Sequence, residues 1–150
     1  MLNKDFSKFG KHFQENLVQI MFEDRAFCDQ VGEVFKVEFL EQKYLQQFVE
    51  NLFDYKEKYQ THPSSQAIAT ILRTELDESN QVLTKQVREF FARIHANPSV
   101  EDEDYVKHTS LDFCRKQKLK EALMKSANLL QKASFDEISV LINEALKLGS

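Results

Sequence analysis

Residues 100–131 read VEDEDYVKHTSLDFCRKQKLKEALMKSANLLQ, a stretch without one glycine or proline. The four acids at positions 101–104 lie where a helix N-terminus carries partial positive charge, so this stretch predicts one long helix. Helical spacing of apolar residues resumes after a short break, at Ile138, Leu141, Ile142, Ala145 and Leu148. Because the connection is short, we expect residues 100–150 to form an antiparallel helical hairpin.

Helical periodicity also organises the first two thirds of the chain. Apolar residues at helical spacing predict five helices, over about 7–22, 26–34, 44–59, 65–76 and 83–94. The third helix ends in the segment KYQTHPSSQAI (58–68), where Pro63 lacks an N–H group and biases His62 away from helical geometry. Ser64 or Ser65 then offers a hydroxyl cap to the fourth helix.

Composition limits the chain to one domain. It has 150 residues, with thirteen Phe, no Trp and only three Gly and two Pro, so phenylalanine is expected to fill the core of a protein with few turns. We therefore predict an all-α fold. An N-terminal helical globule (1–99) is followed by a C-terminal antiparallel helical hairpin (100–150).

Sequence motifs for catalysis or cofactor binding are missing. The three glycines are too far apart to form a phosphate-binding loop, and the four histidines lie in separate segments. His62 is interpreted as a solvent-facing or capping residue of the turn, and the carboxylate pairs at 23–24, 77–78 and 136–137 as structural residues of helix starts or turns. Cys28 and Cys114 lack metal-ligand spacing and are expected to be small buried side chains. We expect no catalytic, cofactor-binding or metal-binding residue.

Charge and hydropathy restrict the class of partner. The net charge of −4 argues against a nucleic-acid-wrapping surface. One basic cluster, in which acids flank four cations, allows either a solvated helix face or a contact with DNA or an acidic partner; its members are Arg115, Lys116, Lys118 and Lys120. Because no signal peptide or membrane span is evident, we expect a cytoplasmic protein without a membrane partner.

The hairpin arms carry more apolar residues than one mutual contact can cover. Beside the main stripes lie Met124, Leu129, Val140 and Leu146. Two helices that pack only on each other leave such flanks exposed, so we expect a second copy of the chain, or the globule, to cover them. The candidate hairpin and dimer interface comprises Leu119, Leu123, Ala127, Leu130, Ile138, Leu141, Ile142 and Ala145. A monomer with one broad core face is the alternative.

The order of these features resembles the N-terminal domain of DnaB-type replicative DNA helicases, in the version found in T-even-like tailed phages. The resemblance covers residues 9–148. The segments that carry it are NLVQIMF (16–22), FCDQV (27–31), VEFL (37–40), FVENL (48–52), YQTHPS leading into AIATIL (59–72), and EDYV to RKQKL (103–119).

This resemblance implies a non-catalytic collar domain. In that family, hairpins pair two subunits, and three pairs form a collar above a hexameric ATPase ring. The collar supports the docking of primase or a helicase loader. ATP, Mg²⁺ and DNA would then be bound by a motor domain, which this chain lacks, and we expect the chain to be an excised N-terminal piece. Alternatives are a free-standing helical adaptor or regulator of a phage, and a single-strand nucleic-acid binder, which would need exposed aromatic residues among basic ones.

Overall fold

The computed structural model describes residues 3–132 and 134–150, and these residues form helices and connecting loops without a strand. The predicted all-α class is confirmed. The elements are η1 (Ser7–Phe9), α1 (Gly10–Glu23), α2 (Arg25–Gly32), η2 (Val37–Phe39), α3 (Lys43–Tyr59), α4 (Ser65–Thr74), α5 (Gln81–Ala96), α6 (Glu103–Leu130) and α7 (Phe135–Lys147), where η denotes a 3₁₀ turn.

The predicted helices are present, and their ends differ by a few residues. The first helix starts at Gly10, because residues 7–9 form the 3₁₀ turn η1. The turn between α3 and α4 has the expected chemistry: Gln60 adopts a left-handed conformation that ends α3, and the Ser64 side chain accepts a hydrogen bond from the Ala67 N–H at 3.1 Å. Ser64, rather than Ser65, is thus the cap of α4.

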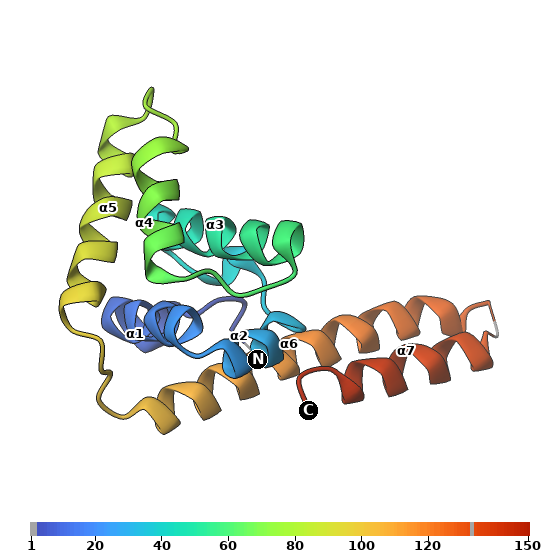
Figure 1. Ribbon diagram of the computed structural model, residues 1–150. Coiled ribbons are helices and arrows are strands. Elements are labelled where there is room, and N and C mark those ends of the chain that lie inside the picture. Colours follow the sequence, from blue (N-terminus) through green and yellow to red (C-terminus); the bar gives the residue numbers. More distant parts are fainter. Residues whose placement is uncertain (1–2, 133) are drawn as a thin grey trace.

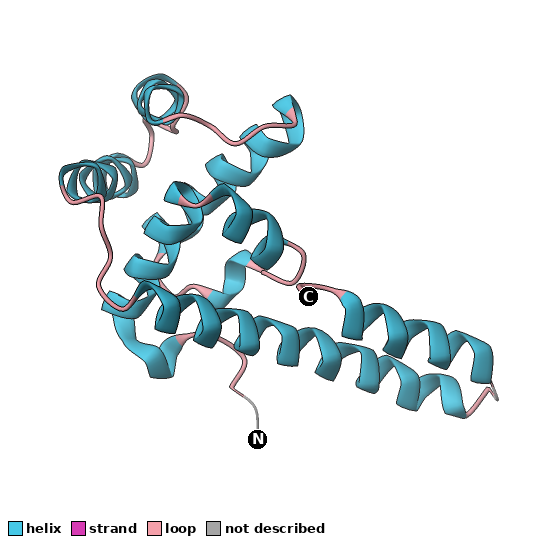
Figure 2. Cartoon of the chain, turned by 60° about the horizontal axis from the view of Figure 1, so that its bottom comes forward, coloured by secondary structure: helices cyan, strands magenta, loops and turns pink. Residues whose placement is uncertain are grey.

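The helices form a packed group from which two long arms project (Figure 1). Helix α1 packs on α2, α3 and α6, whereas α5 packs on α3 and α4. Helix α6 runs beneath this group and continues outward, and α7 returns beside it in the opposite direction (Figures 1 and 2). The outer ends of the two arms therefore have only each other as neighbours among the described residues.

The core is rich in phenylalanine, as its abundance in the sequence suggested. Phe6 is completely buried, and its ring centroid lies 4.6 Å from that of Phe113 in α6 and 5.9 Å from that of Phe39 in η2. The Phe6 N–H also donates to the Phe39 carbonyl at 2.9 Å. Phe6 thus joins the segment before α1 to η2 and to α6, although it precedes the first predicted helix.

Helix α6 belongs to both parts of the molecule. Its first half is buried against the globule at Val106, Ser110, Phe113 and Cys114. The expected division at residue 99 falls in the loop before α6, whereas the change from globule contacts to hairpin contacts occurs inside α6, near Arg115. The end of the hairpin is tied back to α2, because the Gly149 N–H donates to Glu33 Oε2 at 2.8 Å and Gln30 Nε2 donates to the Gly149 carbonyl at 3.0 Å.

Truncation of Phe6 should strongly destabilise the protein. We expect Phe6→Ala to lower the free energy of unfolding by about 3 to 5 kcal/mol, because it leaves a cavity among the rings that hold α6. Val82→Ala is the control, since that side chain is 71% exposed and lies outside the hairpin, and it should change the free energy by no more than about 0.5 kcal/mol. Urea denaturation measures both values, and equal effects would contradict the anchoring role of Phe6.

Candidate functional site

The two hairpin arms meet through small side chains. Ala122 and Ser126 of α6 and Ala145 of α7 are buried, and the Ser126 hydroxyl is bonded within its own helix, donating to the Ala122 carbonyl at 2.7 Å. Small residues allow helix backbones to approach closely. The seam of the hairpin is therefore narrow, and the larger apolar side chains lie beside it.

The structure divides the predicted interface residues into two groups. Ala145 is buried, and Leu119, Ile138, Leu141 and Ile142 are half-buried. In contrast, Leu123 and Leu130 are 54% and 60% exposed, and Ala127 is also exposed. The second group is not covered by any other described part of the chain.

Exposed apolar residues of the two arms, together with the half-buried Leu119 and Ile142, form one apolar surface, which we call the hairpin face. On α6 they recur at intervals of three or four residues, and on α7 they recur at seven and four, so each set follows one side of its helix. A groove of about 350 Å³ is lined by Leu119 of α6 together with Ala145 and Leu146 of α7. The apolar side of α6 therefore lies next to the apolar side of α7. The hairpin face comprises Leu119, Leu123, Ala127, Leu130, Phe135, Ile142 and Leu146.

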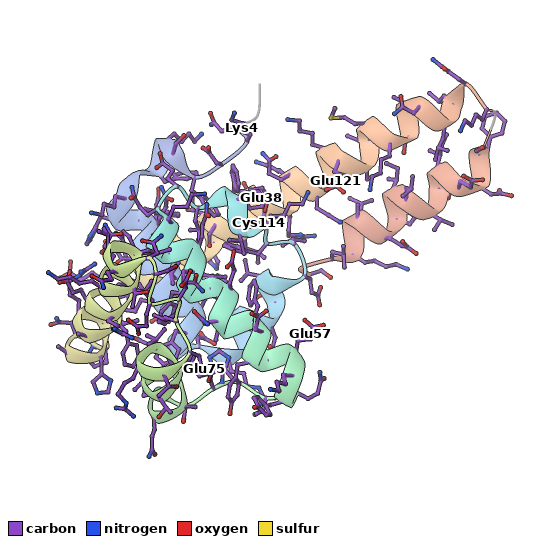
Figure 3. All side chains as sticks on the ribbon, turned by 90° about the horizontal axis from the view of Figure 1, so that it is seen from above. Lys4, Glu38, Glu57, Glu75, Cys114 and Glu121 are labelled. Atoms are coloured by element: carbon purple, nitrogen blue, oxygen red, sulfur yellow. The ribbon has the colours of Figure 1, made fainter. Side chains whose placement is uncertain are left out.

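Two members of the hairpin face were not in the predicted interface. Phe135, the first residue of α7, and Leu146 are 71% and 51% exposed. Leu146 was one of the flanking residues that the sequence analysis expected to be covered, whereas Phe135 was not predicted. The interval of eleven residues between them, which is three turns of helix, places both on one side of α7. Figure 3 shows the side chains of both arms projecting beyond the globule with no other segment over them.

The total exposed surface is large for a chain of this mass. A compact monomer of 17.6 kDa exposes about 7,900 Å², whereas this chain exposes 9245 Å². The difference, about 1,300 Å², exceeds the roughly 800 Å² that each partner buries in a standard protein–protein interface. The projecting hairpin thus leaves enough surface for a stable contact.

The basic cluster is largely occupied by local contacts. Lys116 pairs with Asp112 at 2.9 Å, Lys118 lies 4.0 Å from Glu121, and Arg115 donates to the Leu146 carbonyl at 3.2 Å. Lys120 is half-buried and has no ion pair among the described residues. This geometry favours a solvated helix face over a dedicated phosphate-binding surface, which would need cations that converge on one side.

Glu121 forms ion pairs with lysines from two parts of the fold. Lys36, which precedes η2, reaches it at 2.9 Å, and Lys125 of α6 lies at 3.1 Å. Hydrogen bonds from these ammonium groups lower the pKa of Glu121 to about 2. The pair between Lys36 and Glu121 connects the globule to the hairpin just beyond the last aromatic contact of α6.

His62 has a capping role rather than a solvent-facing one. Its Nε2 lies 2.6 Å from the Phe22 carbonyl in the last turn of α1, and its Nδ1 lies 3.2 Å from the Lys56 ammonium group. A carbonyl can only accept and an ammonium can only donate, so the ring is neutral with its proton on Nε2. Burial lowers the pKa of His62, and the neighbouring Lys56 charge acts in the same direction.

The remaining candidate groups have structural roles. Asp24 caps α2 by accepting from the Phe27 N–H at 3.0 Å, as expected of an acid at a helix start. Both cysteines are buried thiols, and desolvation raises the pKa of Cys28 to about 12.

Over residues 3–132 and 134–150, no three His, Cys, Asp or Glu side chains gather closely enough to hold a metal ion. In the same ranges, no helix is long and apolar enough to cross a bilayer.

Comparisons of the chain with protein-family models, with curated proteins and with solved structures found no match.

The half-buried neutral ring of His62 predicts a pH-dependent stability. Because the pKa is lower in the folded protein than its ordinary value of 6.5, the unfolded chain binds more protons in acid, and the free energy of unfolding should fall as the pH drops through 6.5. In His62→Gln the amide can still donate to Phe22 and accept from Lys56 but cannot titrate. Denaturation at pH 7.5 and pH 5 should show a smaller pH-dependent loss in the variant; identical losses would contradict this.

Proposed function

We propose that this chain is a non-catalytic assembly domain, which pairs with a second copy of itself through the hairpin face. The observation that carries the proposal is the exposure of large apolar side chains on one side of both arms, including Leu123, Leu130 and Phe135. Exposed apolar patches of this extent on a soluble chain are typical of protein–protein contacts.

The shape of the hairpin face suits a two-fold contact. Homodimers most often use the same surface on both subunits, and two rods that each carry an apolar stripe can lie along one another. Charged residues border the stripe, with Asp112 and Lys116 beside the groove at the base of the hairpin. An apolar centre with a polar border is the usual composition of such an interface.

Within this class, we propose the collar domain of a DnaB-type replicative helicase as the particular role. Support comes from the order of sequence features and from a hairpin that projects from a helical globule. In a collar, pairing through hairpins would leave the globules accessible to primase or a helicase loader. ATP and Mg²⁺ would be bound by a separate motor domain, and contact with DNA would occur through that domain.

Pairing predicts a concentration-dependent mass. We expect sedimentation or light scattering to detect a dimer at tens of micromolar that dissociates on dilution. Leu123→Glu and Leu130→Glu each place a charge in the hairpin face and should weaken the dimer at least tenfold, about 1.4 kcal/mol in binding free energy. They should not unfold the chain, since both side chains are already exposed.

Met124→Glu and Val140→Glu are the matched controls. These side chains are 61% and 53% exposed, but their helical positions point them away from the hairpin face. They should leave the dimer unchanged. A monomeric wild-type protein at tens of micromolar, or equal weakening by all four substitutions, would contradict pairing through this surface.

A further inference from the structure

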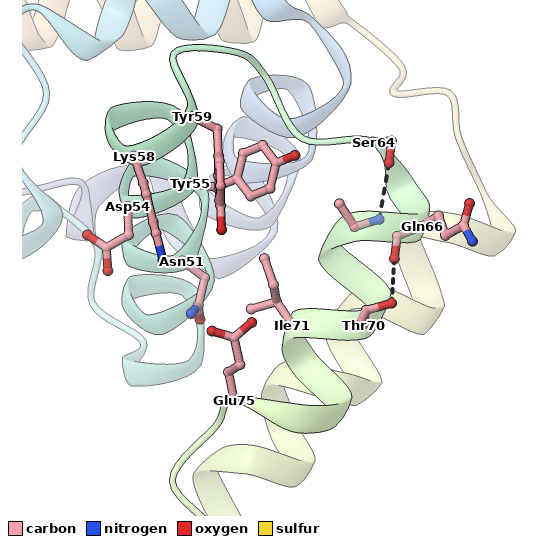
Figure 4. A pocket seen from close by; sticks show the side chains of 11 residues that line it. Asn51, Asp54, Tyr55, Lys58, Tyr59, Ser64, Gln66, Thr70, Ile71 and Glu75 are labelled. Atoms are coloured by element: carbon pink, nitrogen blue, oxygen red, sulfur yellow. Dashed lines mark hydrogen bonds between the residues drawn. The ribbon is translucent and has the colours of Figure 1, made fainter.

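A second concave surface lies between α3 and α4 and uses no residue of the hairpin (Figure 4). This groove has a volume of about 570 Å³. Its walls differ from the hairpin face because they combine aromatic rings with carboxylates. We call it the tyrosine groove, after Tyr55 and Tyr59 of α3, which line it.

The two tyrosines form an aromatic wall. They are one helical turn apart on α3, their ring centroids are 4.7 Å apart, and the rings are inclined by 48°. Tyr59 is 55% exposed. The ammonium group of Lys58 lies 5.3 Å from the Tyr59 centroid, within the range of a cation–π contact. The face of this ring therefore already accommodates a cation, supplied by the chain itself.

Carboxylates border the groove from both helices. Asp54 belongs to α3, and Glu75 directly follows α4. Neither forms an ion pair within residues 3–132 and 134–150, whereas other acids of the fold, such as Asp29 and Glu121, have lysine partners. With Lys58 as the one cation among the lining residues, the groove has a net negative charge.

The remaining lining residues fit a long, partly apolar side chain. Ala67 and Ile71 of α4 are half-buried and supply an apolar strip opposite the tyrosines. Asn51 also lines the groove and lies near Glu75 (Figure 4), and its Oδ1 accepts a hydrogen bond from Gln47 at 3.0 Å. An aromatic face, an apolar strip and two carboxylates are complementary to an arginine side chain.

We propose that the tyrosine groove binds an arginine side chain in a segment of a partner protein. The guanidinium group stacks on Tyr59, displaces the Lys58 ammonium group and pairs with Glu75 or Asp54, while the arginine stem lies against Ile71. Arginine is favoured over lysine because its planar group can stack and bind a carboxylate through two N–H groups at once. Nucleic acid is disfavoured, since its phosphates would face both carboxylates.

Titration of the full-length chain with a small probe tests this. The probe is the blocked peptide acetyl-Gly-Leu-Arg-Leu-Gly-amide, compared with the same peptide carrying citrulline, a neutral side chain of nearly identical shape. Two-dimensional ¹H–¹⁵N NMR should show shifts confined to amides of α3, α4 and the residues that flank α4, with a dissociation constant on the order of 1 mM for the arginine probe. The citrulline probe should bind at least tenfold more weakly.

Three variants refine the test. Tyr59→Leu removes the aromatic face, and the double variant with Asp54→Asn and Glu75→Gln removes the carboxylates; both should weaken binding at least fivefold. Lys58→Gln removes the internal competitor and one positive charge, so it should strengthen binding. Each change is on an exposed or half-exposed residue, and unshifted resonances elsewhere in the spectrum establish that the fold is kept.

Clear outcomes would overturn the proposal. These are equal binding of the arginine and citrulline probes, unchanged or weaker binding in Lys58→Gln, or shifts that appear away from α3, α4 and the residues that flank α4. Binding of a short single-stranded oligonucleotide in the groove would also overturn it. The same titration with Leu123→Glu should give the wild-type result, so failure of hairpin pairing and failure of this groove can be told apart.

Discussion

The burial of the first half of α6 against the phenylalanine core is the contact on which the rest of the structure depends. Helix α6 has 28 residues and extends about 42 Å, longer than the globule can cover. Phe113 lies among Phe6, Phe9 and Phe39 and holds one end of this helix. The other end must project, and α7 accompanies it because an isolated amphipathic helix is only marginally stable in water.

A pair of helices has limited capacity to bury apolar surface. Each arm can turn one side to the other arm, and here that side carries small residues such as Ala122 and Ser126. The larger side chains beside the seam gain little burial from it. Pairing with a second hairpin would remove them from water without a change in the globule, which explains why stability of the fold and assembly can depend on different residues.

The hairpin face and the tyrosine groove are chemically distinct surfaces. The first is a row of aliphatic side chains with Phe135, suited to a copy of itself, and the second presents carboxylates around aromatic rings, suited to a cation. They lie on separate elements, α6 and α7 against α3 and α4. A protein with this arrangement can assemble through one surface and still offer the other to a different partner.

The sequence by itself determined the helical class, the approximate helix positions, the turn capped by Ser64 and the surplus of apolar residues in the hairpin, because these follow from local spacing and capping chemistry. Only the tertiary structure decided which side of each stripe is covered: Leu123 and Leu130 are exposed, while Ala122 and Ser126 form the seam. It also decided the roles of Phe6, of His62 against Phe22 and of Lys36 against Glu121. These contacts join residues far apart in the chain, and periodicity within one helix contains no information about which partner will face it.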